Sequence, residues 1–401
     1  MTQLLTYPDI DPQQWQALID RSPYATWFQT PEAYEFYASN PDEMTPFAFG
    51  VVEDECKVES VKFKGEENSK ADTPASTLYT LHPTQNEAST PYTLHPTPTL
   101  KGVIVGYITR ERNALKQFLT RRAIIIGGPL LDEHISDEAL SALLSAVAQC
   151  KVESVKFKGE ENSKADTPAS TPYTLHPTPI YIETRNFHDY SKWKEIFAEC
   201  GFDYIPHLNF HIDTSSVELV ESRLGKNRKR DIKTSIRDGA TIVENPTIEQ
   251  VREYYTLLKQ LYTTKIKTPL FSLSFFEKLY AMPSGRFILV ELNDEIIGGT
   301  VCVELAGKCL YEWFVCGRDG EWKSIFPSSL ATYAGIRYAA EHGCNRFDMM
   351  GAGKPDEAYG VRDFKARFGG EQVEHGRFLC VRKQLLYWIG KMGVKWLKKF
   401  V

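Results

Sequence analysis

The chain has 401 residues, of which 42% are hydrophobic, 25% charged and 12% aromatic. This aromatic content excludes a disordered chain, and no apolar run reaches the ~18 residues that a membrane-spanning helix needs. The formal net charge is only −5, yet residues 223–237 hold seven Lys/Arg against one acid, and residues 382–401 hold six against none. The two basic segments predict local anion-binding surfaces rather than a protein coated in nucleic acid.

The first residues show no basic segment followed by an apolar stretch, so we expect no secretory signal and a cytoplasmic protein. The eight cysteines form no CxxC pair. We therefore expect neither a zinc site nor a disulfide framework, and no metal ion.

The first half of the chain predicts a mixture of helices and strands, read from hydrophobic periodicity and capping residues. The expected elements are a loop and helix over 22–39, strands over 45–55 and 100–110, a strand over 121–131, a helix over 136–147, a strand over 180–187, a helix over 189–202 and a strand over 207–214.

Two copies of one segment interrupt this pattern. The 22 residues at 56–77 recur letter for letter at 150–171. Identical copies rich in Pro, Thr, Ser, Lys and Glu are typical of inserted flexible segments rather than of an old structural repeat. We call 56–99 and 150–179 the repeat insertions. Without them, strands 45–55 and 100–110 form a hairpin, and helix 136–147 leads directly into strand 180–187.

The second half repeats the pattern of the first. A capping box of Ser215 and Glu218 predicts a helix that ends at Gly239. Further expected elements are helices over 248–262 and 274–282, a three-strand meander over 286–292, 295–305 and 309–316, a helix over 328–343 and a strand over 345–350. Together the two halves predict an α/β protein with two similar domains.

The strongest candidate for chemistry is the segment 347–371. A buried strand ends in the turn Gly351-x-Gly353, and Lys365 and Arg367 follow in a polar stretch. Glycines let the backbone approach a ligand, and N–H groups beside a lysine can hold a developing oxyanion. The alternative is a surface loop whose lysine and arginine are simply solvated.

Two basic helices are further candidates. In the first, cations at spacings of three and four share one face, which suits phosphate ligands but is also typical of a solvated face: Arg223, Lys226, Arg230, Lys233 and Arg237. The second, over 382–401, is amphipathic and either rests on an anionic membrane surface or packs on its own domain. Its apolar stripe comprises Leu385, Trp388, Ile389, Met392, Trp396 and Phe400.

Motifs of P-loop proteins, HExxH metalloproteases and GxSxG hydrolases are absent from the sequence, as is the Gly-rich phosphate loop typical of acetyl-CoA users. Four segments instead resemble the Fem-type family of peptidyltransferases, which build interpeptide branches on peptidoglycan precursors, and related GNAT-like acyltransferases. They are SPYATWFQTPE (22–32), KNRKRDIKTSIRDGATI (226–242), PSSLATYAGIRYAAEHGCNRFDMMGAG (327–353) and YGVRDFKARFGGE (359–371).

The resemblance implies two tandem GNAT-like domains, over 1–205 and 206–381, followed by the basic amphipathic helix 382–401. It also implies transfer of an aminoacyl or acyl group from an activated donor to an amine of a peptidoglycan or other cell-envelope precursor. No cofactor is expected to bind tightly; aminoacyl-tRNA and acyl-CoA remain alternative co-substrates, so tRNA is one alternative partner. The inner membrane surface is another expected contact.

The family's FK motif maps to Phe364 and Lys365, with the lysine at the acyl-transfer site. The phosphates of the precursor are expected at the basic helix, and Tyr359 and Arg367 beside the FK motif are further expected substrate contacts. The residues of that helix are Lys226, Arg228, Arg230 and Lys233. Asp348, at the end of its strand, is an orienting or proton-accepting candidate, or else a plain loop cap. The competing function is a non-catalytic module that binds envelope precursors or RNA and keeps the fold without the chemistry.

Overall fold

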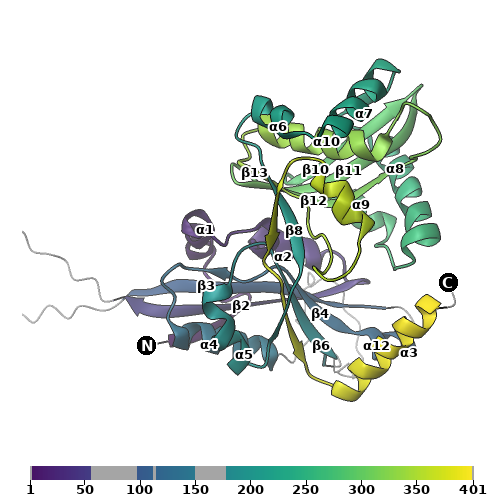
Figure 1. Ribbon diagram of the computed structural model, residues 1–401. Helices are drawn as coiled ribbons and strands as arrows, with labels where there is room; N and C mark the ends of the chain where they lie inside the picture. Colours follow the sequence, from purple (N-terminus) through teal and green to yellow (C-terminus); the bar gives the residue numbers. More distant parts are fainter. Residues whose placement is uncertain (1, 56–96, 112–113, 150–177, 400–401) are drawn as a thin grey trace, which may run out of the picture.

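The computed structural model describes residues 2–55, 97–111, 114–149 and 178–399. They form two α/β units, each built on one mixed sheet and lying one above the other in Figure 1. Most of each repeat insertion lies outside the described residues.

The first sheet has the strand order β1-β2-β3-β4-β6-β15-β7, with β5 beside β3. Only β4 and β6 are parallel among these described pairs. The strands are β1 (Thr2–Thr6), β2 (Met44–Glu55), β3 (Thr97–Thr109), β4 (Arg122–Gly127), β5 (Leu130–Leu131), β6 (Tyr181–Asn186), β7 (Asp203–Ile205) and β15 (Arg377–Val381). β2 and β3 pair as far as Glu55 and Thr97, which confirms the expected hairpin, although β3 begins at Thr97 and so includes the last residues of the segment 56–99 that the sequence assigned to the first repeat insertion.

Local sequence explains where the helices of this unit begin. The Thr30 hydroxyl accepts a hydrogen bond from Ala33 N at 3.1 Å, and Pro31 occupies the first helical position of α2. Ser136 caps α4 in the same way, and the helix-to-strand passage from α4 to β6 is as expected. The helices are α1 (Pro12–Arg21), η1 (Trp27–Gln29), α2 (Pro31–Ala38), α3 (Ala114–Thr120), α4 (Asp137–Ala148), η2 (Ser191–Trp193) and α5 (Lys194–Glu199).

The second sheet has the order β14-β8-β13-β12-β11-β10-β9, and among its described pairs only β12 and β13 are parallel. Its strands are β8 (Leu208–Asp213), β9 (Thr241–Val243), β10 (Gly285–Leu292), β11 (Glu295–Leu305), β12 (Cys309–Gly317), β13 (Arg346–Asp348) and β14 (Glu371–Glu374). The expected meander is confirmed. Asn293 and Asp294 both adopt positive φ, 52° and 62°, as a two-residue hairpin turn requires.

Helices cover both faces of the second sheet (Figure 1). Buried side chains of α6, α7 and α10 share one hydrophobic cluster, against which the partly buried Phe364 of α11 packs, whereas those of α8 and α9 belong to the cluster on the opposite face. The helices are α6 (Val217–Arg223), α7 (Lys226–Arg237), α8 (Ile248–Leu261), the π-helical η3 (Tyr262–Ile266), α9 (Leu273–Tyr280), α10 (Pro327–Glu341) and α11 (Gly360–Ala366). The last helix, α12 (Gln384–Lys399), lies beside α3 of the first unit (Figure 1).

The structure corrects the expected helix over 215–239. Ser216, not Ser215, is the cap, since its hydroxyl accepts from Leu219 N at 3.1 Å. The helix then breaks into α6 and α7 at Leu224 and Gly225. The break has a tertiary cause: Gly225 N donates to Arg367 O at 3.0 Å, so the chain must approach the backbone of another segment there.

A second difference concerns the end of the second domain. The expected boundary places Arg377–Val381 in that domain, but this strand, β15, lies in the first sheet between β6 and β7. The last part of the chain therefore returns to the first unit and ties the two units together.

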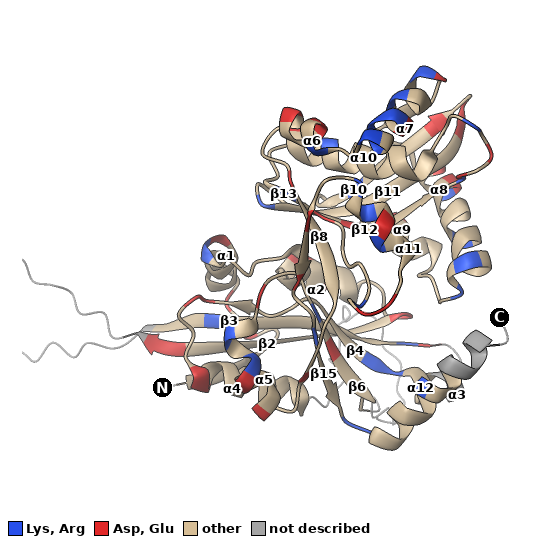
Figure 2. Cartoon of the chain, in the orientation of Figure 1, with Lys and Arg blue, Asp and Glu red and all other residues tan. Residues whose placement is uncertain are grey.

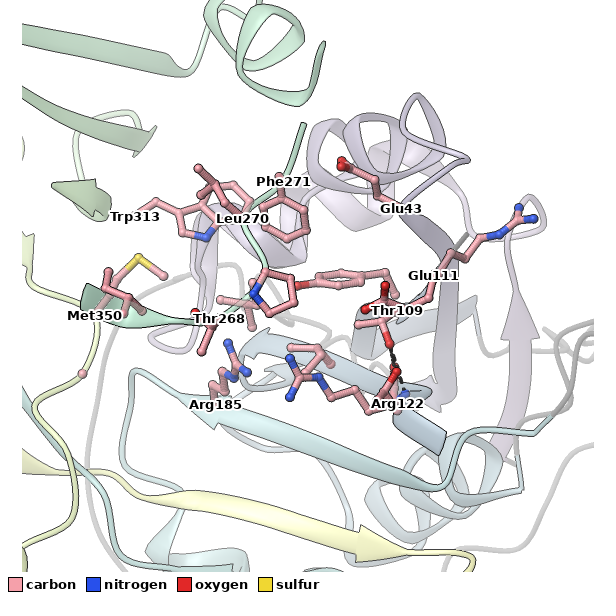
Figure 3. Close-up of a pocket in the computed structure, with 18 of the residues that line it drawn as sticks. Glu43, Thr109, Glu111, Arg122, Arg185, Thr268, Leu270, Phe271, Trp313 and Met350 are labelled. Carbon is pink, nitrogen blue, oxygen red and sulfur yellow. Dashed lines mark hydrogen bonds between the residues drawn. The ribbon is translucent and has the colours of Figure 1, made fainter. Parts of the chain in front are cut away.

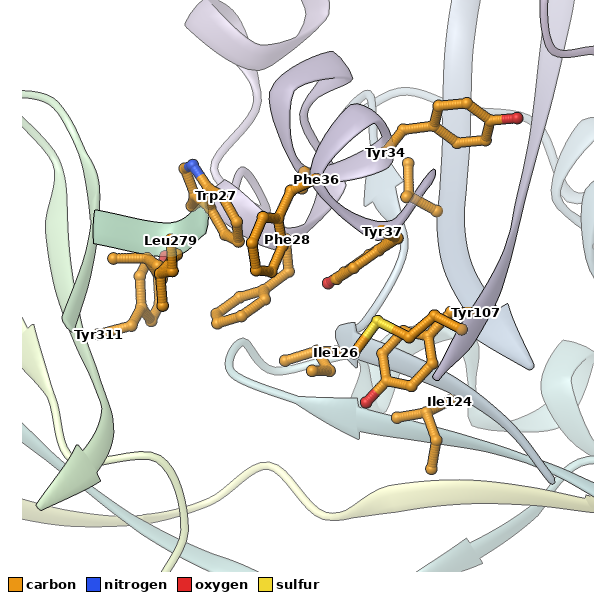
Figure 4. Packing of buried hydrophobic residues seen from close by; sticks show 14 of the residues in the cluster. Trp27, Phe28, Tyr34, Phe36, Tyr37, Tyr107, Ile124, Ile126, Leu279 and Tyr311 are labelled. Carbon is orange, nitrogen blue, oxygen red and sulfur yellow. The ribbon is translucent and has the colours of Figure 1, made fainter. Parts of the chain in front are cut away.

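Aromatic side chains fill the contact between the units (Figure 4). Phe28 meets Tyr311 of β12 edge-on, with ring centroids 5.5 Å apart, and Trp313 at 5.1 Å. Phe36 of α2 meets Phe275 of α9 at 4.9 Å. Buried aromatics at this density hold the two sheets in one fixed arrangement, which defines the walls of the cleft between them.

Candidate functional site

An open edge in the second sheet is the basis of the candidate site. β13 pairs with β12 over three residues only, Arg346–Asp348 against Cys309–Tyr311. The chain then turns through Met350 and Gly351, with φ angles of 52° and 98°, and stays bonded to β8. β12 continues to Gly317. The two parallel strands therefore diverge and leave backbone carbonyls on the β13 side without a strand partner.

Lys365 donates hydrogen bonds to these carbonyl groups. Its Nζ donates to Gly351 O at 2.7 Å and to Met349 O, and the side chain is only 7% exposed. An ammonium has three donors, so one remains without a protein acceptor among the described residues. Burial lowers the pKa of the Lys365 ammonium, while the carboxyl groups of Glu312 and Asp348 oppose that shift.

The helix that carries Lys365 is fixed to the same turn. Arg362 of α11 donates from Nε to Ala352 O at 3.0 Å. The FK motif, expected to be in a polar stretch, is thus helical, and α11 presents its lysine to the diverging strands.

Asp348 lies behind the turn and is fully buried. It accepts hydrogen bonds from Met350 N and from Asn209 Nδ2, both at 2.8 Å, and His211 Nε2 lies 3.1 Å from its other oxygen. Burial alone would raise the pKa of Asp348, but His211 and Arg346 outweigh it and hold that pKa well below its usual range. The Asn209 Oδ1 atom in turn accepts from Gly351 N. The bond from Met350 N is the geometry of a loop cap, and it holds the turn whose carbonyl groups Lys365 contacts.

The expected phosphate-binding residues of α7 do not form one surface. Arg228 is 4% exposed and lies between the rings of Phe364 and Phe368, each centroid 4.5 Å from its guanidinium carbon. It also donates to Ser329 Oγ and to Phe364 O. Phe364 thus packs against Arg228 and Phe368, and Arg228 is too deeply buried to contact a phosphate in this structure.

The other predicted contacts are exposed: Lys226, Arg230, Lys233, Tyr359 and Arg367. Figure 2 shows that α7, with its basic residues in blue, lies on the part of the second unit farthest from the first. Gly225, just before α7, is bonded to Arg367 just after α11, so the basic helix begins beside the FK motif but on the other face of the sheet from the cleft.

A cleft of about 2130 Å³ lies between the units (Figure 3). Met350 and Gly351 of the Lys365 turn form part of its wall, next to Trp313 of β12. The facing wall is the first sheet, from which Arg122 and Arg185 project, and the loop around Leu270 and Phe271 closes one side. The open edge therefore faces a space large enough for a sizeable substrate.

The floor of the cleft carries arginines that the sequence interpretation did not single out. Arg377 donates to Glu183 at 2.6 Å and Arg185 reaches the other oxygen of that carboxylate at 3.3 Å. Burial would raise the pKa of Glu183, but the two arginines lower it to about 2. Arg122, on the neighbouring strand, donates to Tyr181 Oη at 3.3 Å. Three guanidinium groups against one carboxylate leave this floor positive.

A signal for this floor is present in the sequence. In the predicted strand 180–187, Tyr181, Glu183 and Arg185 alternate with Ile182 and Thr184, and alternation places them on one face of a sheet. Charged residues at such positions in a central strand must face a ligand space or a salt bridge.

Comparison with known proteins agrees with this geometry. Residues 226–365 match the family model described as an acetyltransferase (GNAT) domain. The structure is similar to the crystal structure of FemX, with a TM-score of 0.59 and 13% identity, covering 96% of this chain and 99% of that one. A tandem GNAT protein from the clavulanic acid biosynthesis pathway covers 94% of this chain and 98% of its own at 10% identity, with a TM-score of 0.48.

The C-terminal domain of a putative lysylphosphatidylglycerol synthetase from Agrobacterium fabrum gives a TM-score of 0.45 at 12% identity, over 72% of this chain and 85% of that one. No curated protein sequence matches the chain. The GNAT domain ends at the FK lysine, and the expected tandem α/β architecture is confirmed by the two sheets. Residues 226–365 therefore form a GNAT-type acetyltransferase domain within a chain that has the fold of FemX, and the match supports an acyltransferase.

Proposed function

We propose that this acyltransferase moves an aminoacyl or acyl group onto an amine of a peptidoglycan or other cell-envelope precursor. The donor is acyl-CoA or aminoacyl-tRNA; both are cytoplasmic molecules, which places the reaction in the cytoplasm. The observation that carries the proposal is Lys365: a buried ammonium held by the carbonyls of Met349 and Gly351, at the point where two parallel strands diverge and a large cleft begins.

The reaction needs little from the protein beyond position and charge. The acceptor amine attacks the carbonyl carbon of the thioester or ester, and the carbonyl oxygen becomes an oxyanion. The remaining N–H of Lys365 donates to that oxygen in a site largely shielded from water. When the intermediate collapses, the C–S or C–O bond breaks, the amine loses one proton, and the leaving thiol or hydroxyl gains one. A covalent enzyme intermediate is not required.

The acceptor is assigned to the cleft and its acidic groups to the arginine floor. Arg122 and Arg185 point into the cleft from the first sheet (Figure 3) and exceed the charge of Glu183. Phosphate and carboxylate groups, as in peptidoglycan precursors, match the paired N–H donors of a guanidinium.

Because α7 lies across the second sheet from the cleft, we assign its exposed face, at Lys226, Arg230 and Lys233, to the phosphates of the donor and not, as the resemblance implied, to those of the precursor. This face begins beside Arg367 and the FK motif, across the sheet from the cleft. A donor bound there and an acceptor in the cleft would approach the open edge from opposite sides.

The test is product formation by the full chain with each donor and an amine-bearing precursor, followed by mass spectrometry. Removing a donor to an oxyanion costs roughly 10²–10³ in kcat, so we expect Lys365→Ala to lose about that much. Lys354→Ala is the matched control, because Lys354 lies in the loop that leads from β13 to α11, is half exposed, and its side chain pairs only with Glu357 among the described residues.

Thermal unfolding of both variants separates a loss of chemistry from a loss of structure. If Lys365→Ala keeps full turnover, the mechanism is wrong. If the folded parent chain yields no mass increase with either donor while it still binds phosphate ligands, the non-catalytic alternative replaces the proposal.

A further inference from the structure

Helix α12 presents its apolar side chains to solvent rather than to its own domain. Leu385, Trp388, Ile389 and Met392 are 71%, 60%, 42% and 47% exposed. The opposite side of the helix makes the contact with the body, where Tyr387 packs edge-on against the Tyr181 ring at 5.3 Å. Packing on its own core therefore does not account for the apolar stripe that the sequence shows.

A second element that touches α12 also exposes apolar side chains. Phe118 and Leu119 of α3 are 48% and 37% exposed, and α3 contacts α12. Six of the eleven large exposed hydrophobic side chains in the described part of the chain thus gather on two touching helices. A patch of this kind on a soluble domain marks an interaction surface. We name these six residues the α3–α12 patch: Phe118, Leu119, Leu385, Trp388, Ile389 and Met392.

The charge around the patch indicates the kind of surface that the patch binds. Residues 382–401 contain six Lys/Arg and no acid, and Lys391 is exposed on α12 itself. A basic helix with an exposed tryptophan on its apolar face is suited to the boundary between anionic headgroups and acyl chains. None of the described helices is long and apolar enough to cross a membrane, so α12 would lie in the plane of the surface.

A second copy of the chain is a poorer occupant. A two-fold interface through the patch would bring two such basic segments face to face, with no acidic residue in either to offset them. The like charges of two facing basic segments oppose association. In an anionic membrane, by contrast, the headgroups attract the lysines and the acyl chains accommodate the apolar side chains.

We propose that the α3–α12 patch docks the protein on an anionic membrane surface. The patch adjoins the cleft, because Leu119, Leu386, Tyr387 and Lys391 line its wall. A docked protein would hold the mouth of the cleft at the bilayer, so that an acceptor carried on a lipid could enter. This last step rests on the proposed function; the docking does not.

The experiment is flotation of the full chain with vesicles of pure phosphatidylcholine, or of seven parts phosphatidylcholine to three parts phosphatidylglycerol. We expect the parent to float with the anionic vesicles only and to be released by 0.5 M salt. Trp388→Ser/Met392→Ser should weaken the apparent partition by about tenfold or more, and Lys391→Glu by about fivefold or more. Ile236→Ser, which removes an equally exposed apolar side chain from α7, should float as the parent does.

The proposal is overturned if the parent does not float with anionic vesicles, or if the Trp388→Ser/Met392→Ser variant floats as well as the parent. It is also overturned if analytical sedimentation shows that the parent is a dimer and that the Trp388→Ser/Met392→Ser variant is a monomer. Acyl transfer to a soluble amine acceptor is measured in parallel. Activity without flotation removes the membrane proposal alone, and flotation without activity removes the proposed function alone.

Discussion

Arg228 offers the sharpest test of the site's internal structure, because the sequence and the structure give it different roles. A phosphate contact would make Arg228 important for binding and neutral for stability. Its observed position between Phe364 and Phe368 makes it important for stability. The informative substitution is Arg228→Met, which keeps most of the side-chain length and removes the charge and the donors.

The magnitude follows from the contacts. Two buried cation–π contacts contribute about 0.5–2 kcal/mol each. The hydrogen bonds to Ser329 and Phe364 O add about 1 kcal/mol each. Against this, burial of the guanidinium leaves its Nε atom without a hydrogen-bond partner, a cost of about 1–3 kcal/mol that the methionine removes. These terms balance near the middle of their ranges, so we expect Arg228→Met to lower the free energy of unfolding by about 2–3 kcal/mol.

The assay is urea denaturation followed by fluorescence, with Arg230→Met as the matched control. Arg230 is 67% exposed on the same helix and pairs only with its neighbour Asp231 among the described residues, so its loss should change stability by less than about 0.5 kcal/mol. An Arg228→Met protein with unchanged stability and abolished binding of a phosphate-bearing donor would refute the packing argument. Charge reversal of Arg230 and Lys233 should instead weaken donor binding at low salt, and less so at high salt.

Two further predictions concern the cleft and its surroundings. Arg122→Gln and Arg185→Gln should each raise the KM for an anionic acceptor by about tenfold and change kcat less than twofold, whereas Arg252→Gln, at a half-exposed arginine of α8 that does not line the cleft, should change neither; an equal fall in kcat would argue against a binding role. Burial and the nearby Arg346 hold the pKa of His188 at about 3. Below the unfolded pKa of about 6.5, the unfolded chain therefore binds a proton at His188 that the folded chain does not, so the free energy of unfolding decreases as the pH is lowered. Compared with His188→Gln, the parent should lose about 1.4 kcal/mol more between pH 8 and 5.5 in urea titrations, and parallel pH profiles of the two proteins would contradict this.

Local signals predicted most of the elements because the deciding chemistry lies within a few residues. The Asn293-Asp294 turn fixes the hairpin of β10 and β11, and Thr30 and Pro31 start α2 independently of tertiary contacts. The break at Gly225 could not be found this way, since its cause is the backbone of Arg367, more than a hundred residues later. A five-residue strand such as β15 likewise does not encode which of two sheets it joins.

The same distinction applies to the site. Lys365 could be singled out because its motif is contiguous, and Asp348 because it ends a strand. Helical spacing could not separate Arg228 from Arg230, since which side of α7 is buried depends on where α11 packs. The arginine floor was missed because Arg122, Arg185 and Arg377 come from three strands that only the sheet order brings together.

The two sheets have similar strand arrangements but differ in how far their parallel strands pair. This difference gives the two units different roles in the proposed reaction. In the first sheet, the parallel strands β4 and β6 pair along six residues, Arg122–Gly127 against Tyr181–Asn186. In the second, β12 and β13 pair along three and then diverge. A closed pair offers no free carbonyls and no room for an acyl arm, so only the second unit can hold Lys365 at an open edge. The closed sheet of the first unit instead provides a rigid, positively charged surface across the cleft, from which an acceptor can be held against that edge.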